Sequence, residues 1–142
     1  MVILLTGGTG KTSTRIAQRL CQQNLPFLLA SRKISSEVSS NTSITFDWTD
    51  PATWPAVLDH VSVKAVYMVE PQVAQPCIPM IDFVDFAVSR GVKRFVLCAG
   101  TTATRGQDGM GRLWDAFVER NVEYCVLRPS WFMGMFASSR AL

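Results

Sequence analysis

The sequence predicts an α/β fold, with a parallel sheet that carries helices on both of its faces in a doubly wound arrangement. Six apolar runs of strand length alternate with segments whose apolar residues recur at helical spacing. Nearly every residue inside those runs is apolar, which is typical of strands that are covered on both sides and joined by helical crossovers. The chain has 142 residues, of which 48% are hydrophobic and 18% charged. It therefore predicts a single domain, residues 1–142, with enough apolar material for a core.

The apolar runs and the helical segments give the expected order of elements. The expected strands are Val2–Leu5, Phe27–Ala30, Ile44–Phe46, Ala65–Val69, Arg94–Cys98 and Tyr124–Leu127. The expected helices are Lys11–Asn24, Pro51–His60, Pro79–Arg90 and Met110–Asn121. The segment Lys33–Ser43 is rich in serine and asparagine, and this composition predicts a surface loop.

Breaking and capping residues mark the ends of these helices. Pro26 prevents the first helix from continuing, and Gly91 ends the third. Asp50 is a suitable cap for the second helix, and Pro51 suits its first position. The side chains expected to point inward from the first and fourth helices are Ile16, Ala17, Leu20, Leu113, Phe117 and Val118.

Composition and charge exclude several classes of protein. The 14 basic residues outnumber the 11 acidic ones by three, but they are scattered singly or in pairs, so no nucleic-acid-binding stripe is expected. The four cysteines form no Cys-x-x-Cys motif, and we interpret them as small buried hydrophobic residues in a reducing compartment rather than as metal ligands. Because no apolar run has the length of a signal-peptide core or a membrane span, we expect a cytoplasmic protein that binds neither membrane nor metal.

The strongest chemical signal is the segment Thr6-Gly7-Gly8-Thr9-Gly10-Lys11-Thr12-Ser13 between the first strand and the first helix. Glycines allow the backbone to approach a phosphate closely, and the N-terminus of the following helix offers free N–H groups. The variant dinucleotide-binding pattern Gly-x-x-Gly-x-x-Gly is matched at Gly7 and Gly10, whereas Ser13 stands at the third position. The segment thus favours a Rossmann-type site for the diphosphate of NAD(P).

A nucleoside triphosphate is the alternative ligand. Gly10-Lys11-Thr12 matches the end of the P-loop pattern Gly-x-x-x-x-Gly-Lys-Ser/Thr, but Leu5 stands where its first glycine belongs. The loop also looks like that of the MinD-type ATPases, although their signature lysine would fall on Thr6. The loop is short for wrapping a β-phosphate, so we regard an ATPase as the weaker hypothesis.

The end of the second strand favours NADP over NAD. An NAD site usually has an acidic residue there to bind the ribose 2′-hydroxyl, but this chain has Ser31 and Arg32. A hydroxyl and a guanidinium suit a 2′-phosphate. Asp47, at the end of the third strand, is a candidate acceptor for the adenine amino group or else a helix cap. Val69, at the end of the fourth strand, is expected to flank the path of the ribose and nicotinamide.

Taken together, these segments resemble the NmrA-like atypical short-chain dehydrogenases, and most closely the fungal festuclavine/agroclavine dehydrogenases of ergot alkaloid biosynthesis. The residues that carry the resemblance are Ile3–Thr12, Ala30–Arg32, Phe46–Trp48, Ala65–Val69, Val92–Leu97 and Leu127–Met133. It extends over essentially the whole chain. Those enzymes are about twice as long, so the chain resembles the N-terminal half of one, without most of the substrate pocket.

The resemblance implies NADPH-dependent reduction of a cyclic iminium formed from chanoclavine-I aldehyde, with NADP bound by Thr6, Gly7, Gly8, Gly10, Lys11, Thr12, Ser31, Arg32, Asp47 and Val69. The chain has no Tyr-x-x-x-Lys pair, because Pro71 and Arg128 stand four residues after its two tyrosines. No catalytic residue is therefore assigned. Trp131 and Phe132 are candidates for stacking on an indole-bearing cation. A non-catalytic, NADP-binding regulatory protein of the NmrA kind remains a second hypothesis.

Overall fold

The computed structural model describes residues 1–33, 42–59 and 62–131. Within these ranges the chain forms a parallel sheet of six strands in the order β3-β2-β1-β4-β5-β6. The strands are β1 (Val2–Thr6), β2 (Phe27–Ser31), β3 (Ser43–Thr45), β4 (Val63–Val69), β5 (Arg94–Cys98) and β6 (Glu123–Leu127). The helices are α1 (Lys11–Gln22), the 3₁₀ turn η1 (Pro51–Thr53), α2 (Trp54–Asp59), α3 (Cys77–Ser89) and α4 (Met110–Glu119).

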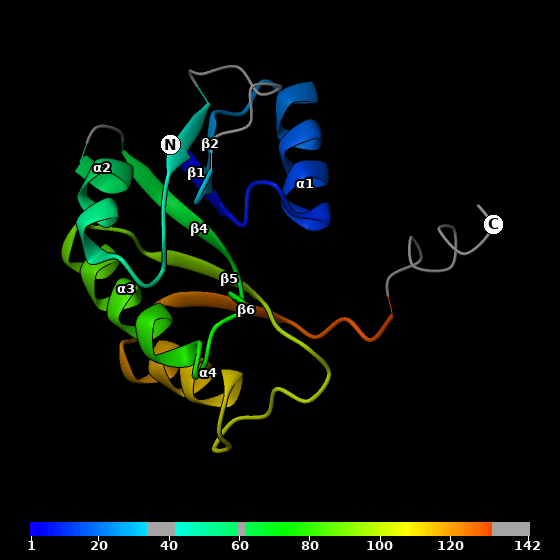
Figure 1. The fold of residues 1–142 in the computed structure, drawn as a ribbon, viewed down its shortest axis with the longest axis vertical. Coiled ribbons are helices and arrows are strands. Elements are labelled where there is room, and N and C mark those ends of the chain that lie inside the picture. Colours follow the sequence, from blue (N-terminus) through cyan, green and yellow to red (C-terminus); the bar gives the residue numbers. More distant parts are fainter. Residues whose placement is uncertain (34–41, 60–61, 132–142) are drawn as a thin grey trace.

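The helices cover both faces of the sheet, which confirms the doubly wound prediction (Figure 1). Leu4 and Leu5 are both fully buried, but successive strand residues point to opposite faces, and they belong to separate apolar clusters. The Leu4 cluster contains residues of α2, α3 and α4, whereas the Leu5 cluster contains Ala17 of α1. Strands are added toward one edge from β1 to β3 and toward the other edge from β4 to β6, so the strand order reverses at the middle of the sheet, between β1 and β4.

The bounds of all four expected helices differ from expectation. The third runs from Cys77 to Ser89 rather than from Pro79 to Arg90, and the fourth ends at Glu119 rather than Asn121. The other two differences have local reasons. The first helix ends at Gln22 rather than Asn24, because Asn24 adopts a left-handed φ of 52°. The segment expected as one helix from Pro51 is divided into η1 and α2, and its last expected residue, His60, lies outside the described residues. Asp50 is confirmed as a cap, since its side chain accepts a hydrogen bond from the Ala52 N–H. Most of the loop expected over Lys33–Ser43 also lies outside the described residues.

The prediction that Val118 points inward was wrong. Leu113, Ala116 and Phe117 of α4 are buried, whereas Val118 is 37% exposed. A helix turns about 100° per residue, so the neighbour of a buried Phe117 lies at the border of the apolar stripe.

The prediction that all four cysteines are buried was also wrong. Cys77 is buried on α3 and Cys98 is half-buried, but Cys21 and Cys125 are exposed; all four are free thiols. Tyr124 stacks on Phe117 of α4, so Cys125, the next residue of β6, points to the opposite face. Within the described residues that face is covered by α1 alone, and α1 lies over β1 and β2 rather than over β6.

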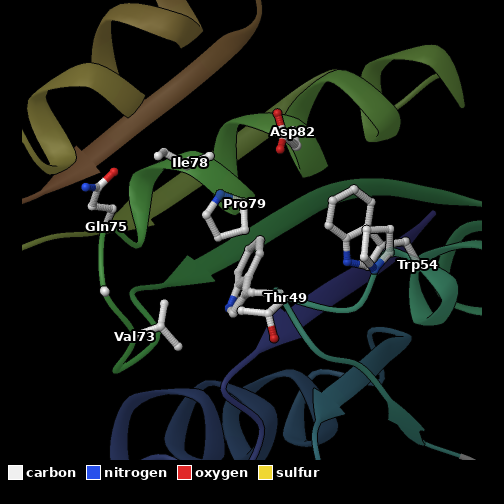
Figure 2. Close-up of a pocket in the computed structure, with 10 residues that line it drawn as sticks. Thr49, Trp54, Val73, Gln75, Ile78, Pro79 and Asp82 are labelled. Atoms are coloured by element: carbon white, nitrogen blue, oxygen red, sulfur yellow. The ribbon is translucent and has the colours of Figure 1, made fainter.

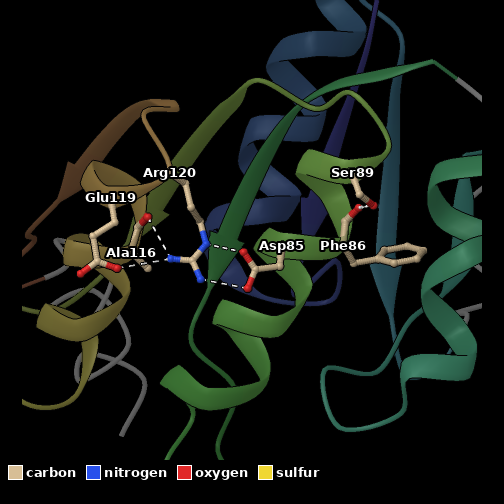
Figure 3. Close-up of polar contacts among 6 residues, drawn as sticks. All are labelled: Asp85, Phe86, Ser89, Ala116, Glu119 and Arg120. Carbon is tan, nitrogen blue, oxygen red and sulfur yellow. Dashed lines mark hydrogen bonds and ion pairs between the residues drawn. The ribbon is translucent and has the colours of Figure 1, made fainter.

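A charged contact joins the two helices α3 and α4. The Arg120 guanidinium at the end of α4 binds both carboxylate oxygens of Asp85 on α3 and also donates to the Ala116 carbonyl (Figure 3). Hydrogen bonding from Arg120 lowers the pKa of Asp85 below its ordinary value. The Asp85 side chain is 54% exposed, so we expect the pair to orient the helices more than it stabilises them.

No helix in the described part of the chain combines the length and the apolar character that a membrane crossing needs. The sheet topology instead brings the carboxyl ends of β1, β2, β4 and β5 to one edge, and the loops that follow them define the site described next.

Candidate functional site

Thr6 joins the ends of the two central strands. Its buried hydroxyl donates to the Tyr67 carbonyl and accepts from the Val69 N–H, both at 3.0 Å. These bonds continue the pairing of β1 with β4 by one step beyond the Leu5–Tyr67 pair. Val69 is thereby held beside the glycine loop, at the place where the sequence predicted it.

The glycine loop contains one tight turn and is hydrogen-bonded to the end of β2. The Gly8 N–H donates to the Ala30 carbonyl at 2.9 Å, and the Gly10 N–H donates to the Gly7 carbonyl at 2.7 Å. Gly7 has a left-handed φ of 63°, and a Cβ at Gly8 would lie 3.3 Å from the backbone nitrogen and oxygen of Ala30. Glycine is therefore required at both positions by conformation or by close approach.

Ser13 takes the place of the third glycine for a structural reason. Its side chain is fully buried and donates to the Thr6 carbonyl at 2.6 Å, which ties the first turn of α1 to the end of β1. The departure from the Gly-x-x-Gly-x-x-Gly pattern is thus a replacement of close packing by a hydrogen bond.

Changing Ser13→Gly completes the glycine pattern but is expected to destabilise the protein. Loss of the buried hydrogen bond, added to the cost of glycine in a helix, should lower the free energy of unfolding by about 2–3 kcal/mol. Urea denaturation measures the change. The control Gln18→Gly, at an exposed position of the same helix, should cost only about 0.5–1 kcal/mol. Equal losses in the two variants would show that the Ser13 hydroxyl contributes nothing.

Two cavities flank the Gly7–Val69 contact. The first, the β2-side cavity of about 240 Å³, has a lining that includes Gly7, Ser31, Arg32, Asp47, Val69 and Glu70. The second, the β5-side cavity of about 470 Å³, is lined by Gly7, Gly10, Lys11, Thr12, Arg15, Val69, Glu70, Cys98, Ala99 and Gly100. Because Gly7, Val69 and Glu70 line both, the two cavities form one path across the strand ends.

The structure brings together eight of the ten residues that the sequence assigned to a cofactor. Thr6 and Gly8 line neither cavity, and their positions instead shape the loop. The sequence analysis did not assign Thr9, Arg15 and Glu70, which also line the path. Glu70 directly follows β4, and its place at the strand end was the available signal for it. Trp131 is 70% exposed and lines neither cavity, while Phe132 lies outside the described residues.

The β2-side cavity contains both a carboxylate and a guanidinium, those of Asp47 and Arg32. In the β2-side cavity, hydrogen bonds from the Thr49 N–H and hydroxyl to Asp47 Oδ1, both 2.8 Å, lower the pKa of Asp47, and the nearby Arg32 charge adds to this effect. Asp47 is therefore an ionised acceptor with its second oxygen outside these bonds. The Ser31 hydroxyl donates to the Lys33 carbonyl at 2.6 Å, and Arg32 is the one cationic donor among the residues that line this cavity.

Tyr67 lies beneath the glycine loop, where its hydroxyl interacts with Cys98 and Thr12. Burial, together with the hydrogen bond to Cys98, raises the pKa of Tyr67 from 10.0 to about 12. The phenol is thus neutral at physiological pH and unsuited to act as a base.

This pKa predicts a specific dependence on pH. Because the pKa is higher in the folded state, the contribution of Tyr67 to stability is complete below pH 10 and is lost as the pH rises toward about 12. Phenolate absorbance of the native protein, compared with that of Tyr67→Phe, should assign to Tyr67 a titration near pH 12. A Tyr67 titration centred on pH 10 in the folded protein would contradict the prediction.

Within the described residues, no group of three or more His, Cys, Asp or Glu side chains is placed to hold a metal ion. The observed donors instead suit an anionic, extended ligand. The first N–H groups of α1 have no acceptor inside the helix and face the loop at Gly10–Thr12, as a diphosphate requires. The glycine loop at the junction of the two cavities and the Arg32 guanidinium in the β2-side cavity suit an NAD(P)-like dinucleotide.

Comparison with known proteins agrees with this geometry. No family model matches the sequence. Agroclavine dehydrogenase of Claviceps fusiformis is 44% identical over 144 residues, which cover 97% of this chain and 49% of that protein. Festuclavine synthase I of Penicillium roqueforti is 39% identical over 141 residues, which cover 94% of this chain and 48% of that protein. The chain therefore spans about half the length of these curated relatives.

Solved structures show the same fold at low sequence identity. Triphenylmethane reductase of Citrobacter sp., complexed with NADP(H), has a TM-score of 0.75 at 16% identity, covering 94% of this chain and 51% of that one. The NADPH-dependent quinone oxidoreductase QOR2 of Escherichia coli, complexed with NADPH, has a TM-score of 0.75 at 17% identity, covering 96% and 52%.

The strand order and the glycine loop define a Rossmann-type domain with the fold of the short-chain dehydrogenases and NmrA-like proteins. In sequence, the chain is a homologue of the fungal agroclavine dehydrogenases and festuclavine synthases over nearly all of its own length.

Proposed function

We propose that this chain binds NADPH along the path formed by the two cavities and is the cofactor-binding part of a reductase that converts a cyclic iminium ion into a clavine alkaloid. The observation that carries the proposal is the 44% identity with a protein named agroclavine dehydrogenase. The proposal includes an iminium derived from chanoclavine-I aldehyde as substrate, agroclavine or festuclavine as product, and a cytoplasmic location.

Each end of the path has residues that suit one part of the cofactor. Gly7, Gly10 and the N-terminus of α1 would hold the diphosphate, with Lys11 and Thr12 beside it. In the β2-side cavity, Arg32 would bind the 2′-phosphate through paired donors, with Ser31 next to it.

The remaining acceptor and apolar groups suit the bases and sugars. The ionised Asp47 would accept from the adenine amino group through the oxygen that Thr49 does not bind. Val69, held in place by Thr6, would form the floor between the adenosine and nicotinamide halves. Gly8 would contribute by keeping the loop close to β2.

The absence of a Tyr-x-x-x-Lys pair is consistent with an iminium substrate. NADPH held by the glycine loop and Arg32 would supply a hydride to the iminium carbon, so that the carbon–nitrogen double bond would become a single bond and its electron pair would become the lone pair of the amine. No oxygen acquires charge in this step, and no proton donor is needed. The protein's contribution is to position the two reactants and exclude water.

Trp131 and Phe132 are proposed to contact the indole part of the substrate. Trp131 follows β6 closely, and the Arg128 guanidinium, three residues earlier, donates to the Thr101 carbonyl at 2.5 Å. That bond keeps the segment after β6 next to the loop that follows Cys98, at the β5-side cavity. Stacking of a cation on Trp131 would contribute about 0.5–2 kcal/mol.

The experiment is a fluorescence titration of the purified chain with NADPH, NADH and MgATP, followed by an assay of NADPH oxidation with the iminium. We expect selective NADPH binding. Binding of ATP alone would refute the cofactor and favour the ATPase hypothesis, although only Gly7, Gly8 and Thr9 separate the end of β1 from Gly10, which leaves little room for a triphosphate loop. Binding of NADPH with no oxidation, both by this chain and by a version extended to the length of its relatives, would favour the NmrA-like regulatory hypothesis.

A further inference from the structure

A third cavity, the tryptophan pocket, lies outside the proposed cofactor path. It has a volume of about 380 Å³ and is lined by Trp48, Thr49, Pro51, Trp54, Val73, Ala74, Gln75, Ile78, Pro79 and Asp82 (Figure 2). It lies between the segment after β3 and the start of α3. None of the glycine-loop residues line it, but Trp48, Thr49 and Val73 also line the β2-side cavity. Its volume is in the range of sites for small organic molecules.

The aromatic wall of this pocket is held in place by the core. Trp48 and Trp54 each pack edge-on against the fully buried Phe83, with ring centroids 5.3 and 5.4 Å apart. Trp48 also packs edge-on against Phe46 at 4.9 Å, and Trp54 Nε1 donates to the Asp47 carbonyl at 3.0 Å. Both indoles are therefore fixed, and a ligand would meet a formed surface to which each indole, 6% exposed, contributes a small part of its area.

The charge of the pocket is negative. Asp82, one turn after Ile78 on α3, is the one charged residue of the lining, which contains no lysine or arginine. The nearby Asp85 is paired with Arg120, and Asp59 of α2 is paired with Arg90, whereas no such ion pair forms at Asp82 among the described residues. A carboxylate in a lining that is otherwise uncharged attracts an organic cation and disfavours an anion.

We propose that the tryptophan pocket binds a small protonated amine with an apolar ring body. The ring body packs on the Trp48 and Trp54 side of the pocket, against Val73 and Pro79, and the ammonium group lies toward Asp82. This proposal does not depend on the proposed NADPH chemistry, because Asp82 lines the pocket and not the cofactor path, although Trp48, Thr49 and Val73 line both cavities.

The test compares tryptamine, which is cationic at neutral pH, with tryptophol, which has the same indole and a neutral hydroxyl. Binding to the wild-type chain is measured by calorimetry, and its location by amide chemical-shift changes. We expect tryptamine to bind about three to ten times more tightly than tryptophol, with the largest shifts in residues 73–82. Asp82→Asn should reduce the affinity for tryptamine to that for tryptophol.

A matched variant separates a local effect from a change in net charge. Asp108→Asn removes an exposed carboxylate that does not line the pocket and should leave tryptamine binding unchanged. Equal affinities for the two probes, equal effects of the two substitutions, shifts confined to the glycine loop, or no saturable tryptamine binding at millimolar concentration would each overturn the proposal. Because NADPH is absent from these measurements, their failure leaves the proposed function untouched.

Discussion

Replacing Arg32→Ala is expected to reduce the affinity for NADPH by about ten- to a hundredfold, because a charged hydrogen bond contributes roughly 1.5–3 kcal/mol. Arg32 lines the β2-side cavity at the end of β2, and the Ser31 hydroxyl beside it already donates to Lys33. No other guanidinium or ammonium group lines that cavity within the described residues. The affinity for NADH, which lacks the 2′-phosphate, should change little. Fluorescence titration with both nucleotides measures the selectivity.

Arg19→Ala is the matched control for this experiment. Arg19 is an exposed arginine near the end of α1 and lines neither cavity. The Arg19→Ala variant should leave the affinities for NADPH and NADH unchanged, although it removes the same charge as Arg32→Ala. If Arg32→Ala weakened NADPH and NADH equally, the guanidinium would be acting on a part common to both nucleotides, and the assignment of the 2′-phosphate to this cavity would be wrong.

An alanine at Gly111 is expected to destabilise the fold by about 3 kcal/mol, because a well-packed region must move to accept it. Gly111 lies in the first turn of α4, and a Cβ there would lie 2.0 Å from the Thr104 carbonyl oxygen. That oxygen belongs to the backbone and cannot rotate away. The loop before α4 is also held by the bond from the Gly106 N–H to Asp115, at 2.8 Å. Urea denaturation of Gly111→Ala measures the loss.

Gly100→Ala provides the comparison in the same loop. The atom nearest to a Cβ at Gly100 is the Thr102 hydroxyl oxygen at 3.9 Å, an ordinary contact. This change should alter the free energy of unfolding by no more than about 0.5 kcal/mol. Equal stability of the two alanine variants would contradict the prediction. It would mean that the loop before α4 is loosely packed and moves away from a Cβ at Gly111 without a cost in free energy.

Local sequence patterns predicted most of the secondary structure. Strand β5 was predicted with the bounds that it has, and Asp50 was predicted as a cap, because a run of apolar residues or a capping side chain acts over a few neighbouring positions. The same patterns could not place Val118 or Cys125. Whether a residue at the border of an apolar stripe is covered depends on a partner element distant in the sequence.

In the candidate site too, some features follow from local sequence patterns and others depend on contacts between distant elements. The sequence by itself determined the doubly wound fold, the glycine loop and the positions of Arg32, Asp47 and Val69 at strand ends, because parallel strands joined by helices must bring those ends to one edge. Only the tertiary structure decided that Ser13 replaces a glycine by bonding to Thr6, that Thr6 joins β1 to β4, and that two tryptophans and Asp82 line one further pocket. These contacts depend on sheet register and on the packing of helices against it. Thr6 and Tyr67 are 61 residues apart, and no local pattern specifies contacts at such a separation.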